Sequence, residues 1–127
     1  MGKEVVSSEG APCAIGPYSQ AIVAKGVVYA SGQIGIVPAT GRLVEGGTVA
    51  EARQALENID AVLRSAGSSL AKAVKVTVYL TDIDDFADVN ALYMKYFHEK
   101  PPARSCVGIA KLPLDARIEI DAIAIQD

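Results

Sequence analysis

The strongest pattern in the sequence is an apolar stripe between Thr48 and Gly67. Its members recur at steps of three and four residues, so they share one face of a predicted α-helix. They are Ala52, Ala55, Leu56, Ile59, Val62, Leu63 and Ala66. Thr48 and Glu51 have the spacing of a capping box, and Gly67 is placed to end the helix. A helix with one apolar face needs a second layer to cover that face.

The next segment predicts a strand and then a second helix. Between Ala73 and Leu80, apolar and polar residues alternate, with Val74, Val76 and Val78 on one face. Asp84 or Asp85 can cap the second helix, which Pro101-Pro102 prevents from continuing. Its apolar stripe is Phe86, Val89, Leu92, Tyr93, Tyr96 and Phe97.

The remaining strands complete the layer that the helices cover. Residues 20–31 predict a hairpin that turns at Lys25-Gly26, and residues 35–47 an irregular surface connection. Two further strands are expected at about 103–109 and 117–125, with a turn between them at Leu112 to Asp115. The sequence thus predicts an α+β fold of order β-β-α-β-α-β-β, a single-layer sheet with two helices on one face, in one domain spanning residues 1–127.

Two helices cannot cover both faces of such a sheet. The strands nevertheless carry apolar residues on both faces, among them Val27, Tyr29, Ile123 and Ile125. An apolar sheet face is more stable against another subunit than against water. We therefore expect an oligomer.

Charge and residue counts exclude several classes of function. The formal net charge is −3, which leaves no basic surplus for a nucleic-acid backbone. His98 is the single histidine, so a histidine zinc site or a Ser-His-Asp triad lacks its residues. Cys13 and Cys106 are far apart and show no metal-ligand spacing. No apolar run reaches the length of a membrane span and no export signal is recognised, so we expect a cytoplasmic protein that binds no metal.

Arg104 and Glu119 are the residues best suited to chemistry. A guanidinium binds a carboxylate through two parallel hydrogen bonds, and a glutamate can orient water or act as an acid or base. The two side chains could share a cleft if their strands pair. The alternative is a structural ion pair. Cys106 invites a role as nucleophile, but no histidine is placed to activate it, so a thiol in the pocket wall is the better interpretation.

Four separated motifs resemble the RidA family, also known as the YjgF-type or translation-inhibitor family. They are Gly16-Pro17-Tyr18-Ser19-Gln20-Ala21, Ser31-Gly32-Gln33-Ile34, Pro102-Ala103-Arg104-Ser105-Cys106-Val107 and Ile118-Glu119-Ile120-Asp121-Ala122-Ile123-Ala124. The resemblance extends from about residue 14 to residue 125 and implies a chorismate mutase-like fold. It also implies a homotrimer with sites between subunits.

The activity implied by the resemblance is hydrolysis of reactive enamines and imines. Such an enzyme, a 2-iminobutanoate/2-iminopropanoate deaminase, converts 2-aminoacrylate and its imine tautomer to a 2-keto acid and ammonia, as metabolite damage control and without a cofactor. By matching position, Arg104 would bind the substrate carboxylate and Glu119 would position water and relay protons. The implied substrate-binding residues are Tyr18, Ser31, Gly32, Cys106 and, from a neighbouring subunit, Asn90.

Two other functions are compatible with these residues. One is a regulatory trimer that binds a small carboxylate without turnover. The other is an RNA-cleaving translation inhibitor, against which the acidic charge and the single histidine weigh. The connection from Phe97 to Pro101 is shorter than in the family pattern, and Pro101 stands where an aromatic residue is frequent, so substrate size is left open.

Overall fold

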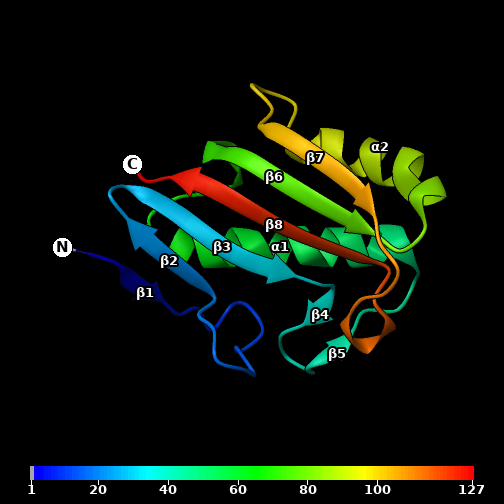
Figure 1. The fold of residues 1–127 in the computed structure, drawn as a ribbon, viewed down its shortest axis with the longest axis horizontal. Coiled ribbons are helices and arrows are strands. Elements are labelled where there is room, and N and C mark those ends of the chain that lie inside the picture. Colours follow the sequence, from blue (N-terminus) through cyan, green and yellow to red (C-terminus); the bar gives the residue numbers. More distant parts are fainter. Residues whose placement is uncertain (1) are drawn as a thin grey trace.

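The strands and helices form two layers, with α1 (Thr48–Ser65) and α2 (Phe86–Tyr96) behind one six-stranded sheet (Figure 1). The computed structural model describes residues 2–127. The strands of this sheet are β1 (Glu4–Val6), β2 (Ala21–Ala24), β3 (Val27–Gln33), β6 (Ala73–Leu80), β7 (Ala103–Gly108) and β8 (Ile118–Ile125). Their spatial order is β1-β2-β3-β8-β6-β7. The predicted class and the predicted order of seven elements are confirmed, while β1 was not anticipated.

The strand β8 lies at the centre of the sheet, antiparallel to both β3 and β6. Its side chains alternate strictly between the two faces. Ile118, Ile120, Ala122 and Ala124 are buried in the core beneath the helices. Glu119 and Asp121 are only partly buried and point to the opposite, open face.

The edge strand β7 is the parallel partner of β6, to which α2 connects it. Val76 is the register partner of Arg104, and Val78 that of Cys106. Register partners share a sheet face, and both valines are buried in the core. Arg104 and Cys106 therefore lie on the helix side of the sheet.

The ends of the helices differ in part from the prediction. The capping box at Thr48 and Glu51 is wrong: α1 begins without a side-chain cap. Thr48 Oγ1 instead donates to Asp85 Oδ2 at 2.7 Å, and Glu51 Oε1 accepts from the Arg117 amide at 2.8 Å. The Asp85 side chain thus accepts a hydrogen bond from the first residue of α1 and does not cap α2. Gly67 follows the last turn of α1 with φ +77°, as expected for a helix stop.

The remaining elements are a small second sheet, a register shift and short 3₁₀ turns. The expected loop at 35–47 holds a two-stranded sheet of β4 (Ile36–Val37) and β5 (Arg42–Leu43), so that prediction is wrong in part. A register shift near Ala73 leaves Val74 44% exposed instead of on the buried face of β6. Short 3₁₀ turns are η1 (Leu70–Lys72), η2 (Ile83–Asp85) and η3 (Pro113–Asp115).

The open face of the sheet carries apolar side chains that α1 and α2 do not cover. Tyr29 and Ile125 are 48% and 47% exposed, and they are flanked by their register partners Ile123 and Val27.

No helix among residues 2–127 combines the length and hydropathy of a membrane span.

Asn58 links α1 to the segment that leaves β3. Its amide is buried and donates to the carbonyl oxygens of Ile34 and Ile36 at 3.3 and 2.8 Å. These two carbonyls lie where the chain changes direction between the sheets, so Asn58 fixes the end of the β3 region.

We expect Asn58→Ala to lower the free energy of unfolding by about 2 kcal/mol, because two carbonyl oxygens lose a buried donor. Urea denaturation at equal protein concentration measures this. Glu57→Ala, an exposed neighbour on the same helix, is the control and should change the value by less than about 0.5 kcal/mol. Equal effects of both variants would contradict the assignment.

Candidate active site

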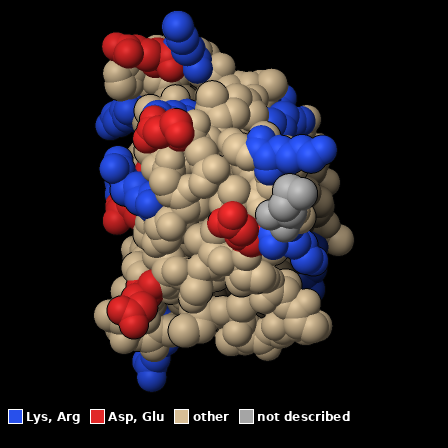
Figure 2. Space-filling view, turned by 90° about the vertical axis from the view of Figure 1, so that its left-hand side faces the viewer, with Lys and Arg blue, Asp and Glu red and all other residues tan. Residues whose placement is uncertain are grey.

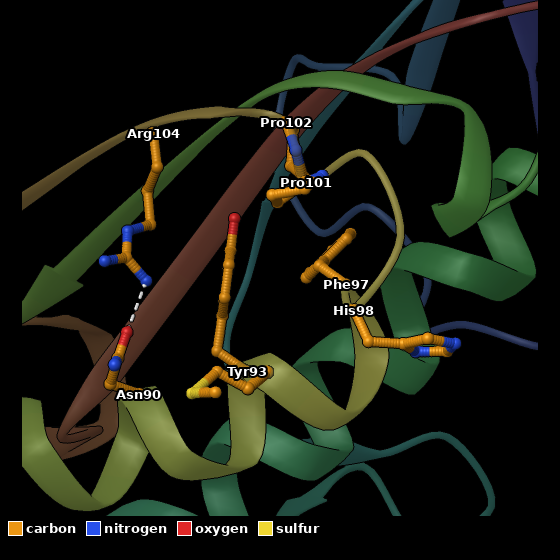
Figure 3. A pocket seen from close by; sticks show the side chains of 8 residues that line it. Asn90, Tyr93, Phe97, His98, Pro101, Pro102 and Arg104 are labelled. Carbon is orange, nitrogen blue, oxygen red and sulfur yellow. Dashed lines mark hydrogen bonds between the residues drawn. The ribbon is translucent and has the colours of Figure 1, made fainter.

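Arg104 is held in place by three residues of α2. Its guanidinium carbon lies 4.6 Å from the ring centre of Tyr93 and 5.2 Å from that of Phe86. One terminal N–H donates to Asn90 Oδ1 at 2.8 Å (Figure 3). The rings and the amide fix the plane of the guanidinium, while the other N–H groups of the five that arginine carries are left for a ligand.

A cavity of about 530 Å³ opens beside this guanidinium. Arg104 and Asn90 form one end of it, and Tyr93 stands between them and Phe97 (Figure 3). The other lining residues are Met94, His98, Pro101 and Pro102. The cavity size falls within the range of about 300–1,000 Å³ typical of small-molecule sites.

Glu119 lies on the open face of the sheet, against the backbone of Gly32. A Cβ atom at Gly32 would lie 2.6 Å from Glu119 Oε2 and 2.8 Å from its Cδ. A side chain at position 32 would therefore force the Glu119 carboxylate to move from this position. Burial raises the pKa of Glu119, and the negative charge of Asp121 raises it further. A carboxyl group with a raised pKa can exchange protons nearer neutral pH.

Ser31, the residue before Gly32, makes two hydrogen bonds to the segment before β2. Ser31 Oγ donates to the Ser19 carbonyl at 2.6 Å, and the Ser31 amide donates to the Gln20 carbonyl at 2.9 Å. The sheet register shifts between Ala30 and Gln33, so residues 31–32 form an irregularity beside Glu119. Tyr18 lies in the loop before β2 with its side chain 51% exposed.

Cys106 has the properties of a residue that lines a pocket and not those of a nucleophile. Its thiol is partly buried against the core, and burial raises its pKa more than the neighbouring charge of Arg104 lowers it. A nucleophilic cysteine needs the thiolate, and the raised pKa disfavours it. The interpretation of Cys106 as a pocket thiol is consistent with this environment.

The structure separates the predicted residues into two groups. Arg104, Asn90 and Cys106 lie on the helix side, whereas Glu119 and Gly32 lie on the open side. The strands β7 and β8 do not pair, because β6 lies between them. The ion pair between Arg104 and Glu119, considered as the alternative, is therefore absent from residues 2–127. Asn90, expected from a neighbouring subunit, contacts Arg104 of its own chain.

Sequence reasoning missed the aromatic support beneath Arg104. Phe86 and Tyr93 were assigned to the apolar stripe of the second helix, and Tyr93 is indeed buried. Its ring also packs against Phe97, with centres 4.5 Å apart. The sequence held one indication of this contact: Phe86 and Tyr93 lie on the helix that comes directly before the strand of Arg104. Within residues 2–127, no three His, Cys, Asp or Glu side chains are grouped as ligands for a metal ion.

Comparisons with known proteins agree with one another. The family model described as "Endoribonuclease L-PSP" matches residues 8–126. A protein of Capra hircus named 2-iminobutanoate/2-iminopropanoate deaminase is 49% identical over 98% of this chain and 90% of its own. Yeast Mmf1 superposes with a TM-score of 0.95 at 42% identity, covering 98% of this chain and 99% of its own. Escherichia coli TdcF with bound serine superposes with a TM-score of 0.92 at 39% identity, over the same shares.

The hydroxyl group of Tyr93 is buried and has no hydrogen-bond partner within residues 2–127. We expect Tyr93→Phe to raise the free energy of unfolding by about 1 kcal/mol, because it removes an unsatisfied polar group and keeps the ring beneath Arg104. Tyr93→Ala, which also removes the ring, should lower it by about 3 kcal/mol or more. Urea denaturation compares the three proteins, and a loss of stability in Tyr93→Phe would show that the hydroxyl has a partner.

Proposed function

The chain belongs to the Endoribonuclease L-PSP family, and on that premise we propose that it is a hydrolase which deaminates reactive 2-imino and enamine acids. Membership also confirms the resemblance drawn from the four motifs, since the goat relative carries the deaminase name. The products would be 2-keto acids and ammonia. The single observation that carries the proposal is the guanidinium of Arg104, oriented at the end of a cavity with donors to spare.

Arg104 would bind the carboxylate of the substrate. Its hydrogen bond to Asn90 occupies one N–H, and the stacked rings keep the guanidinium plane fixed. A fixed plane favours two parallel bonds to a carboxylate, which lysine could not make. The serine bound to TdcF also carries a carboxylate. The predicted pocket residues Tyr18, Ser31 and Gly32 would complete the site beside Glu119.

The reaction needs little more than a placed water molecule. Water adds to the electrophilic carbon of the protonated imine and passes one proton to Glu119. The carbinolamine nitrogen then takes that proton from Glu119. The carbon–nitrogen bond breaks as the hydroxyl group returns its proton to Glu119, so the carbonyl forms and ammonia leaves. Holding the carboxylate and the water in this geometry supplies much of the rate enhancement.

The separation of Arg104 and Glu119 argues for an assembled site. They face opposite sides of one sheet, so one copy of the chain cannot direct both at one substrate. A ring of copies, each offering its β7 edge to the open face of the next, would bring them together. The apolar side chains Tyr29 and Ile125 on that face favour such burial. We propose the homotrimer implied by the resemblance, with one site at each boundary.

Ribonuclease activity, named in the family description, has less support from this chain. The charge is −3 with one histidine, and acidic side chains lie among the basic ones on the face shown in Figure 2. A nuclease needs phosphate-binding cations and two placed acid or base groups. The cytoplasmic location and the role in metabolite damage control stay predictions.

We expect Arg104→Ala to lower kcat/KM by about 100-fold or more, because the carboxylate anchor is lost. A serine dehydratase generates 2-aminoacrylate, and formation of pyruvate above the uncatalysed rate is followed. Arg104→Lys should remain at least about tenfold impaired, because a point charge cannot replace the planar donors. Wild-type protein that binds 2-ketobutyrate without accelerating the decay would favour the regulatory alternative instead.

A shared site predicts recovery of activity in mixed oligomers. Arg104→Ala and Glu119→Gln should each be nearly inactive alone. Refolded together in equal amounts, they should regain about a quarter of the wild-type activity, since one boundary in four then combines an intact Arg104 with an intact Glu119. Each variant refolded with itself is the control. Absence of recovery in verified mixed oligomers would place both residues in one chain's site.

The pKa of Glu119 should govern the acid limb of the pH profile. If the ionised carboxylate accepts the proton from water, kcat/KM rises as pH rises through this pKa, which burial and Asp121 raise. Asp121→Asn removes the smaller of these two causes, so the acid limb should move to lower pH. The uncatalysed rate is subtracted at each pH. A limb that stays in place or moves to higher pH would exclude Glu119 as that base.

A further inference from the structure

The cavity beside Arg104 is larger than the smallest imino acids require. Its volume is about 530 Å³, while 2-iminopropanoate carries only a methyl group beyond its reacting carbon. With the carboxylate on Arg104, the rest of the cavity extends past Tyr93 toward Phe97 and His98 (Figure 3). We infer that this cavity receives the side chain of the substrate and that the enzyme favours 2-imino acids with large apolar side chains. This inference rests on the proposed function.

The cavity walls have the chemistry of an apolar subsite. Tyr93 and Phe97 are 5% and 6% exposed, and their rings pack together, so this wall is rigid and already formed. Pro101 and Pro102 supply a second wall with restricted backbone torsions. Such preformed apolar surfaces bind a ligand without much ordering of their own.

Met94 also lines the cavity. It lies one residue after Tyr93 on α2 and is 61% exposed, so its side chain has room to adjust. Methionine is flexible and adapts to apolar groups of different shape. This wall therefore tolerates branched, thioether and aromatic side chains alike.

The charges around the cavity disfavour cationic substrates. Of the eight described residues that line it, none is Asp or Glu, and Arg104 is already positive. A lysine-like or arginine-like side chain would find no carboxylate partner among them. The preferred class is thus the imines of leucine, methionine and phenylalanine.

The test compares a large and a small imine in the same protein. An L-amino acid oxidase with catalase generates the imines of leucine, phenylalanine and alanine, and kcat/KM is measured for each. Wild-type enzyme should favour the leucine or phenylalanine imine. Met94→Trp and His98→Trp, which fill the cavity from two sides, should lower the large-to-small ratio at least about tenfold, since fit in an apolar pocket is worth about 10- to 200-fold per methylene.

A matched control separates the cavity from the rest of α2. Lys95 follows Met94, is exposed and does not line this cavity, so Lys95→Trp should leave the ratio within about twofold of wild type. Ratios that stay within twofold of wild type in Met94→Trp and His98→Trp would overturn the inference while leaving the proposed function intact.

A binding experiment distinguishes failure of the proposed function from failure of the inference about the cavity. If no imine is hydrolysed, the proposed function fails, and 4-methyl-2-oxopentanoate and pyruvate then serve as stable probes in calorimetry. Tighter binding of the larger acid, lost in Met94→Trp and kept in Lys95→Trp, supports the subsite without turnover. Equal affinity for both acids in the wild-type protein would overturn it.

Discussion

The pairing of β6 with β8 under α1 is the interaction on which the rest of the structure depends. Burial of Ile118, Ile120 and Ala122 decides which side of β8 faces the helices. A shift by one residue would bury Glu119 and expose the isoleucines, which the hydrophobic effect opposes strongly. The register of β6 is passed on to β7, so the side of the sheet on which Arg104 lies follows from the packing of residues two strands away.

Two polar centres follow from this constraint, and each is shaped by close contacts of its own. On one side, aromatic rings and an amide orient Arg104 before any ligand arrives. On the other, the missing side chain of Gly32 makes space for a partly buried carboxylate. Both arrangements hold a polar group in a defined position, which lowers the entropic cost of binding a ligand there. The proposed assembly unites them.

Local patterns predicted the elements well and their contacts less well. The stripe of α1 and the alternation of β8 were readable because their periods are set by the chain itself. Thr48 and Glu51 were misassigned because Asp85 and the Arg117 amide, distant in sequence, compete for the same side chains. The opposite orientation of Arg104 and Glu119 was invisible for a similar reason. It depends on β6 lying between β7 and β8, and strand order is a property of the whole sheet.

The central position of β8 has a consequence for how the chain is made. Residues 118–125 leave the ribosome after every other strand of the sheet, yet β3 and β6 meet only through them. Until then the nascent chain holds two partial sheets with unpaired edges, which are prone to pair with other chains. A ribosome that stalls before residues 118–125 emerge would therefore present a form of this sheet with open edges, which chaperones would have to shield.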